Sequence, residues 1–489
     1  MTAVILPSLT SLGLLTWILI SEVFKRRMLG IAVFGMTTLH YIVLVAFPAL
    51  YSSWDGFYYE RVLGSAPSDL AIVYRGDLVF LLLFTLGYFA YGRKTKVGRT
   101  HLNPLTPVNR RLCTVLVACG VIVFGRQLLN PTFSVLDTRN YADLIEYPDL
   151  TSRLFTYAFG FLMWPSLFAA SIVFVLPRRR NFTWLLSAIL LLEQAIYAFI
   201  NGLRGGVVWV GCTLILSCCL LRTWRFLIAC IFLGVAVAPL LDILHEEIRW
   251  NTMSNGIDSR NIDMLGGALS IVVNEIGKPA DVDTPNFLAT WCDRAQGPRN
   301  SVVLYKEFHS GRGAGMRPIV ASLGVVVPRT VWPEKPVGGS VDNTNLGAAI
   351  YLVQREKGNM GPQDMGPLLA SAHAYWEGGW PWLCIAGIIT GFFWKALVSW
   401  GSASASIGPP IAVLCLTASL PIDGFLTVLN PIYNYVLMLL KVVIPLLLLT
   451  RFNETLGRLQ FRGINLFSHV RTPRKSHGNA AIHLQPHSD

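Results

Sequence analysis

The chain has 489 residues, of which 53% are hydrophobic and only 14% are charged. Soluble domains carry roughly a quarter charged residues, so this composition excludes an ordinary soluble protein and predicts one built for lipid. A net charge of +12 would fit a nucleic-acid partner, but the basic residues are distributed as in a membrane protein, and we expect no nucleic acid to bind.

Apolar runs of about 20 residues recur along the chain, and each is long enough to cross roughly 30 Å of hydrocarbon. We place eleven transmembrane spans near residues 4–24, 28–50, 74–92, 112–128, 154–176, 182–200, 205–221, 226–244, 381–399, 407–427 and 432–450. The expected fold is an all-α polytopic membrane protein with one large, helical extracytoplasmic loop.

The distribution of basic residues predicts the orientation. Lys25, Arg26 and Arg27 follow the first span, which favours an N-terminus outside the cytoplasm. With that topology, 20 of the 40 basic residues and only two acids fall in the segments predicted to be cytoplasmic, which are 25–27, 93–111, 177–181, 222–225, 400–406 and 451–489. We expect the basic segments 93–111 and 451–475 to face anionic lipid headgroups.

Four regions follow from this reading. Spans one to eight occupy residues 1–244, the large loop 245–380, spans nine to eleven 381–450, and a basic, partly disordered tail 451–489. The loop carries 14 of the 28 acids, and a structureless loop of that length would be unusual, so it should be folded. Within it we predict an in-plane helix over 262–276, a helix over 344–357, and a short helix from Pro367 that Gly378 and Gly379 end.

The positions of the cysteines predict neither disulfide bonds nor a metal site. Eight of the nine cysteines fall inside apolar runs, and only Cys292 lies in a long polar segment. Neither a disulfide framework nor a metal-binding pair follows from these positions, and we expect neither a metal nor another cofactor.

Arginines on the predicted outer face form the first group of candidate site residues. The guanidinium fork suits phosphate oxygens, although each such arginine could instead reach the interface or pair with a nearby acid. Arg204 lies in a glycine-rich turn after span six. Arg329 and Lys335 lie on a proline-rich stretch, 327–336, which is either a preorganised anion site or a plain rigid linker. The outer-face set is Arg126, Arg204, Arg249, Arg260, Arg312, Arg317, Arg329 and Lys335.

Possible proton acceptors form the second group. His373 and Glu377 are four residues apart on the short helix before span nine, so they share a face. Asp342 begins the preceding helix, and His245, Glu246 and Glu247 follow span eight. A carboxylate or imidazole near hydrophobic walls can take a proton from an attacking hydroxyl. The alternative for each is a surface charge or a helix-end partner.

Two charges within spans, Glu193 and Lys441, are predicted at depths that differ by only about 3 Å. A buried structural pair is one reading, and a proton or ion path is the other.

Nucleotide and hydrolase motifs are missing from the sequence: it has no Walker A, dinucleotide-binding, HExxH or GxSxG pattern. A site outside the cytosol has no ATP or nucleotide sugar, so its substrate must bring its own activation. A lipid-linked diphosphate meets that requirement.

Three motifs occur in an order that is typical of one family. They are Gly202-Leu203-Arg204-Gly205, the segment from Pro328 to Pro336, and the segment from Ala374 to Trp380. With these motifs, the span count and the single large loop, residues 1–450 resemble the O-antigen polymerase (Wzy-type) or oligosaccharide repeat-unit polymerase family. Members often have Glu two residues before the tyrosine of the last motif, where this chain has His373.

The resemblance implies a GT-C-like architecture and a reaction. A sugar hydroxyl of one polyprenyl-diphosphate-linked repeat unit attacks the anomeric carbon of a glycan on a second polyprenyl diphosphate, without metal or cofactor. The donor's diphosphate would be bound by Arg204, Arg317, Arg329 and Lys335, and the second lipid's diphosphate by Arg249 and Arg260. The proton would be accepted by His373, Glu377 or Asp342. The glycan would contact Trp332, Tyr375 and Trp376.

The same resemblance implies a setting. It places the protein in a bacterial inner membrane, with its site facing the periplasm and the C-terminus in the cytoplasm. Its product would be O-antigen, capsule or exopolysaccharide, and a chain-length regulator and a flippase would be its partners. The rival functions are an O-antigen ligase that transfers glycan to lipid A-core, a flippase for lipid-linked oligosaccharides, and a structural membrane scaffold.

Overall fold

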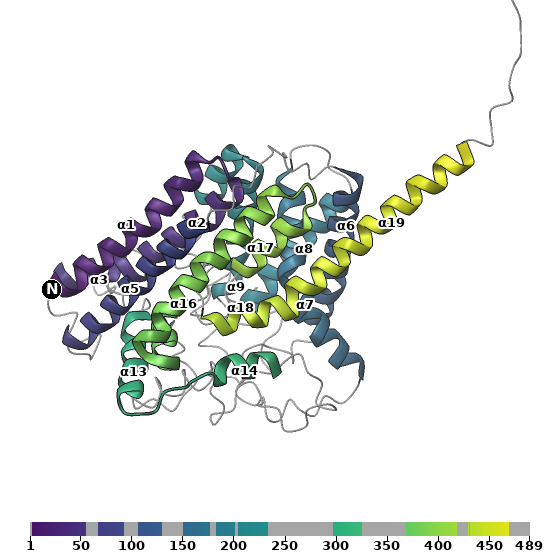
Figure 1. The fold of residues 1–489 in the computed structure, drawn as a ribbon. Coiled ribbons are helices and arrows are strands. Elements are labelled where there is room, and N and C mark those ends of the chain that lie inside the picture. Colours follow the sequence, from purple (N-terminus) through teal and green to yellow (C-terminus); the bar gives the residue numbers. More distant parts are fainter. Residues whose placement is uncertain are drawn as a thin grey trace, which may run out of the picture.

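The structure is a computed structural model that describes residues 2–54, 67–91, 106–129, 150–176, 182–200, 204–232, 297–324, 368–417, 429 and 431–468. Every regular element within these ranges is a helix, which confirms the predicted all-helical class (Figure 1). The helices predicted at 262–276 and 344–357 and the proline-rich stretch 327–336 lie outside the described residues.

The described helices form one bundle (Figure 1). In chain order they are α1 (Thr2–Phe24), α2 (Met28–Tyr41), η1 (Ile42–Ala46), α3 (Phe47–Trp54), α5 (Pro67–Ala90), α6 (Pro107–Leu129), α7 (Leu150–Val175), α8 (Phe182–Ile200), α9 (Arg204–Leu221), α13 (Gly297–His309), α14 (Arg317–Gly324), α16 (Ala370–Ala403), α17 (Gly408–Thr417), α18 (Ile432–Met438), η6 (Leu439–Val443) and α19 (Ile444–Ser468). The π-helical turns η1 and η6 continue directly into the helices on either side of them.

Six stretches are long and apolar enough to cross a membrane, and each overlaps a predicted span. They are Ala3–Phe24, Met28–Tyr51, Ser68–Ala90, Pro107–Arg126, Ala370–Ala403 and Asn434–Leu456. Four further apolar helices coincide with predicted spans but are shorter in the described part: Phe161–Val175, Phe182–Tyr197, Trp209–Leu221 and Gly408–Thr417. The chain is therefore a helical membrane protein, and the count of eleven spans stays a prediction.

Helix α5 begins at Pro67, seven residues before the predicted third span. The local sequence explains the earlier start, because proline suits the first helical position and Asp69 in the first turn is favoured by the helix dipole. The helix then continues through Arg75 and Asp77, two charged residues that lie inside the predicted span. Asp77 is nevertheless buried, with 4% of its surface exposed.

Helix α16 contains the predicted break before span nine. Gly378 and Gly379 have non-helical backbone angles, with φ of −162° and +65°, so a short segment, Ala370–Glu377, precedes the long helix that follows. A positive φ is readily adopted only by glycine, which is why the break falls at this pair. We call residues 370–377 the pre-break segment.

The pair α5 and α16 packs unusually closely. Gly387 and Gly391 are four residues apart on α16, and both lie against the backbone of α5. A Cβ on Gly387 would lie 2.7 Å from the Phe80 carbonyl oxygen, and Gly391 leaves no room for a Cβ beside the Phe84 carbonyl. This small-xxx-small spacing is how membrane helices bring their backbones together.

Three segments predicted to be cytoplasmic, 93–111, 400–406 and 451–489, meet at one end of the bundle. Asn109, at the start of α6, donates to the Ala405 carbonyl and accepts from the Ile407 amide, at 3.3 and 3.0 Å. Asn453 of α19 donates to the Val108 carbonyl at 2.9 Å. Figure 1 shows α13 and α14 at the opposite end, so the chain alternates between two ends as a multi-span protein should.

Candidate functional site

The pre-break segment carries four of the residues that the sequence singled out. His373, Tyr375, Trp376 and Glu377 are all buried, with between 1% and 7% of their surface exposed. Tyr375 and Trp376 belong to an apolar core that includes residues of α5 and α13 as well. The helix α13 of the large loop is thus packed into the end of the bundle.

Two short contacts fix the pre-break segment against the turn between α13 and α14. The Ala314 amide donates to the Trp376 carbonyl at 2.9 Å, and the Trp376 indole donates to the Arg312 carbonyl at 3.0 Å. A third contact lies at the other end of the segment, where the Leu369 amide donates to the Ser301 hydroxyl at 2.9 Å. The segment is therefore held at both ends by α13 and the turn that follows it.

Glu377 is the carboxyl group of this site. Its Oε2 accepts a hydrogen bond of 2.6 Å from the indole of Trp382, beyond the glycine break. Its Oε1 is buried and has no hydrogen-bond partner within the part of the chain that the structure describes. A carboxylate with apolar walls and one oxygen available is suited to accept a proton from a hydroxyl group.

His373 lies one turn before Glu377 and is 1% exposed. Its ring is 6.3 Å from that of Trp376, centroid to centroid, in an edge-to-face arrangement. Of the two described candidate bases, Glu377 is the less deeply buried, with 7% of its surface exposed. The third candidate, Asp342, lies outside the described residues.

An aromatic stack covers the same segment. Tyr375 stacks on Tyr305 of α13 at 4.2 Å and contacts the edge of Trp380 at 5.4 Å. Its hydroxyl is 3.5 Å from Nε2 of His309. Burial raises the pKa of Tyr305 far above its ordinary value, so this phenol stays neutral. Tyr375 is 3% exposed, whereas Trp380 is 41% exposed, so Trp380 is the ring of the stack that faces outward.

Of the outer-face candidate arginines, Arg312 and Arg317 lie at the turn between α13 and α14, Arg204 at the start of α9, and Arg126 in the last turn of α6. Arg312 forms a bidentate contact with Glu307, at 2.6 and 2.9 Å, and its side chain is 61% exposed. Arg317 is the exposed first residue of α14. It follows Ala314 by three residues, so its Cα is within about 11 Å of the residue that bonds Trp376.

Arg204 is the first residue of α9, so Arg204, Gly205 and Gly206 belong to a helix and not to the predicted glycine-rich turn, whose first residues, 201–203, lie outside the described residues. The remaining predicted ligand residues, which are Arg249, Arg260, Arg329, Trp332 and Lys335, lie outside the described residues. Their convergence with Arg317 stays a prediction.

Asp77 of α5 is a residue that the sequence reading missed. Its carboxylate accepts hydrogen bonds from the Tyr41 hydroxyl at 2.7 Å and from the Ser371 hydroxyl at 3.2 Å. Ser371 belongs to the pre-break segment. An acid inside an apolar run was the available signal, because such residues are rare in spans and are retained for a reason.

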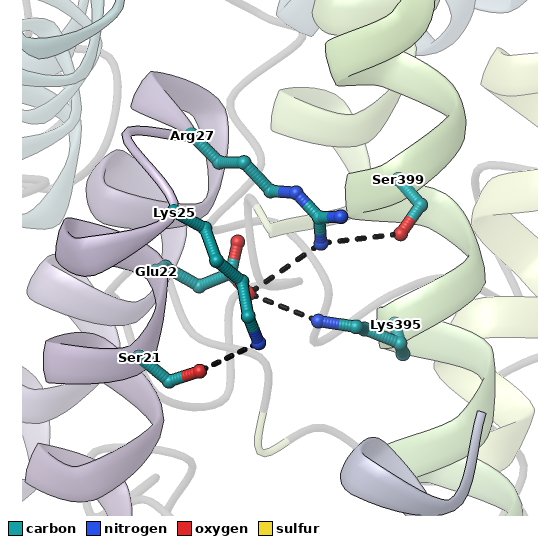
Figure 2. Close-up of polar contacts among 6 residues, drawn as sticks. All are labelled: Ser21, Glu22, Lys25, Arg27, Lys395 and Ser399. Carbon is teal, nitrogen blue, oxygen red and sulfur yellow. Dashed lines mark hydrogen bonds and ion pairs between the residues drawn. The ribbon is translucent and has the colours of Figure 1, made fainter. Parts of the chain in front are cut away.

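A second buried polar cluster lies toward the other end of α16 (Figure 2). The Lys395 ammonium is 3.0 Å from Glu22 Oε1, and Arg27 is 3.7 Å from the same oxygen and 3.5 Å from the Ser399 hydroxyl. Lys395 also lies 4.3 Å above the ring of Tyr88. These charges, too, sit inside predicted spans or directly beside them.

The predicted pair of Glu193 and Lys441 is not formed. Both residues are described, and they make no ion pair with each other; Glu193 Oε2 is buried without a hydrogen-bond partner among the described residues, and Lys441 is exposed. Equal depth was the only basis for the prediction, and depth does not determine which way two helix faces point.

No family model, no curated protein and no solved structure matches this chain. Within the described ranges, no three His, Cys, Asp or Glu side chains are grouped so that they could hold a metal ion.

Proposed function

We propose that this protein is a membrane-embedded glycosyltransferase that polymerises lipid-linked oligosaccharide repeat units. The donor is a glycan on polyprenyl diphosphate, and the acceptor is a single repeat unit on a second polyprenyl diphosphate. The proposal rests on the ordered sequence motifs and on the site at the start of α16. It includes the eleven-span topology, with α13 and α14 on the outer side of a bacterial inner membrane.

The observation that carries the proposal is the position of Glu377. It is buried with one carboxylate oxygen left without a donor in the described part of the chain, and its neighbour Trp376 bonds the turn that holds Arg312 and leads to Arg317. A proton acceptor, together with an arginine for the departing diphosphate, is what attack by a hydroxyl on a diphosphate-activated sugar requires. Neither a flippase nor a scaffold needs this combination.

In the proposed reaction the acceptor hydroxyl gives its proton to Glu377. The oxygen of the acceptor hydroxyl then bonds to the donor's anomeric carbon, and the bond from that carbon to the diphosphate oxygen breaks. Polyprenyl diphosphate leaves as an anion, and Arg317 stabilises its charge, together with the predicted ligands Arg204, Arg329 and Lys335.

Reconstitution tests the function. The purified protein is placed in liposomes with polyprenyl-diphosphate-linked repeat units, without nucleotide, and the products are separated by electrophoresis. We expect a ladder of glycans that differ by one repeat unit. Glu377→Gln should slow its formation by about 10²-fold or more, because a general base contributes on that scale.

The matched control is Glu454→Gln, which makes the same change on α19, at the other end of the bundle, where Glu454 pairs with Arg451. It should leave the ladder intact. Transfer only to added lipid A-core would identify a ligase, and movement of the lipid across the bilayer without a new glycosidic bond would identify a flippase. Either result, or an unchanged rate in Glu377→Gln, contradicts the proposal.

A further inference from the structure

Asp77 connects the membrane-spanning part of the bundle to the pre-break segment. Its two carboxylate oxygens each accept one hydroxyl donor, Oδ2 from Tyr41 of α2 and Oδ1 from Ser371 of the pre-break segment. All three residues are buried. Asp77 forms no ion pair within the described part of the chain, so these two neutral donors are the interactions that accompany its burial.

Stability alone does not account for a carboxyl group at this place. Burying such a group without a cation costs free energy, and a well-packed apolar side chain would usually be at least as stable. A directional hydrogen bond adds something that apolar packing lacks, because it fixes the position of the donor. One of the two donors to Asp77, Ser371, is only six residues before Glu377.

Residues of α5 and α13 also pack closely beside Asp77 and the pre-break segment. The hydroxyl of Tyr305 lies directly against Gly76, so closely that no Cβ could be added there, and the ring of Tyr305 stacks on Tyr375 at 4.2 Å. Together with the bond from the Leu369 amide to Ser301, these contacts hold the pre-break segment against α5 and α13.

From this arrangement we infer that Asp77 is a positioning residue: through Ser371, it holds the pre-break segment in the place from which Glu377 acts. Tyr41 anchors Asp77 to α2 and makes no hydrogen bond to the segment in the described structure. The expected effect on catalysis rests on the proposed function. The claim that Asp77 holds the pre-break segment in place through Ser371 does not.

Two substitutions separate positioning from general stability. Ser371→Ala and Tyr41→Phe each remove one hydroxyl donor from Asp77, and only Ser371 lies on the pre-break segment. Both should lower the melting temperature of the purified protein by a similar few degrees. Hydrogen exchange of amides 370–377 should become about tenfold faster in Ser371→Ala and stay within twofold of wild type in Tyr41→Phe.

In the polymerisation assay, Ser371→Ala should lower kcat by about tenfold or more with KM within twofold, since a small misplacement of a catalytic group has effects of that size. Tyr41→Phe should leave kcat within twofold. Asp77→Asn, which keeps a hydrogen-bonding side chain of the same shape, should retain more of kcat than Asp77→Leu, which removes it.

Exchange that is equally fast in both single variants, or unchanged in both, would overturn the inference. So would a kcat that falls equally in Ser371→Ala and Tyr41→Phe. If the wild-type protein makes no ladder, the proposed function fails, and hydrogen exchange still decides whether Asp77 holds the segment through Ser371.

Discussion

Lys395 in α16 places its ammonium nitrogen 3.0 Å from a carboxylate oxygen of Glu22 in α1, and 8% and 0% of the two side chains are exposed (Figure 2). We predict that Lys395→Met destabilises the protein by about 3–5 kcal/mol, the usual cost of removing one partner of a buried pair. Arg27, at 3.7 Å, would remain as the only cation beside Glu22 in the described structure. Thermal or denaturant unfolding in detergent measures the change.

The control for this cluster is Lys25→Met, because Lys25 is exposed and bonds only the neighbouring Ser21 in Figure 2. It should change stability by no more than about 0.5 kcal/mol. The double variant Glu22→Gln with Lys395→Met should lose less than the sum of the two single losses. Additive losses would mean that the two buried charges do not stabilise each other.

Gly391 of α16 gives a second prediction, on helix packing. A methyl group at this position would meet the Phe84 carbonyl of α5, and backbone cannot move aside as a flexible side chain can. Gly391→Ala should therefore destabilise by about 1–3 kcal/mol, the cost of overpacking, although alanine favours helix. Gly211→Ala is the matched control within α9, since nothing lies within 4 Å of its Cβ position, and it should be neutral or slightly stabilising.

The spans that are apolar throughout could be predicted from the sequence. The first two appear as Ala3–Phe24 and Met28–Tyr51, within a residue of the predicted bounds, because uninterrupted apolar residues leave little doubt about where lipid lies. The third starts at Ser68 instead of residue 74, because the polar residues of its first turn, Ser68 and Asp69, lower the hydropathy there. It also contains the charges of Arg75 and Asp77. Those charges are tolerated because tertiary partners, such as Tyr41 and Ser371 for Asp77, come from elsewhere in the chain.

The site could be predicted only in part, for a related reason. Spacing along one helix placed His373 and Glu377 together and located the break at Gly378 and Gly379. The partners of this segment are distant in sequence, as the 294 residues between Asp77 and Ser371 illustrate. A local pattern carries no information about such contacts. The pairing of Glu193 with Lys441 failed for the same reason.

The glycine break supplies a third prediction. Gly379 has φ of +65°, and a Cβ there would lie 2.7 Å from the ring of Phe308. Gly379→Ala combines backbone strain of about 1–2 kcal/mol with this clash. Gly311→Ala, at φ of +79° with nothing within 4 Å, carries the strain alone and should cost less.

Replacing Phe308 tests the clash directly. Adding Phe308→Leu to Gly379→Ala should recover part of the lost melting temperature, because the shorter side chain leaves room for the methyl group. Adding it to Gly311→Ala should recover nothing. Equal losses in the two glycine variants would show that the contact with Phe308 is unimportant and that only the backbone conformation matters.

Arg317 gives the prediction that bears most directly on substrate binding. It is exposed, and it forms no ion pair with another described residue, so Arg317→Ala should leave the melting temperature unchanged. If it binds the donor's diphosphate, losing a charge-assisted hydrogen bond of about 1.5–3 kcal/mol should raise KM for the donor by roughly 10- to 100-fold. Arg317→Lys should be intermediate, because lysine keeps the charge and loses the planar fork.

Arg451→Ala is the control for charge, since Arg451 is also exposed, on a different helix at the other end of the bundle. Its KM should match wild type. Added salt should raise the wild-type KM and have less effect on Arg317→Ala, because the screened interaction is already absent. A wild-type KM in Arg317→Ala, with the ladder intact, would remove Arg317 from the diphosphate site. The anion would then have to be bound by arginines elsewhere on the chain, such as Arg204 at the start of α9.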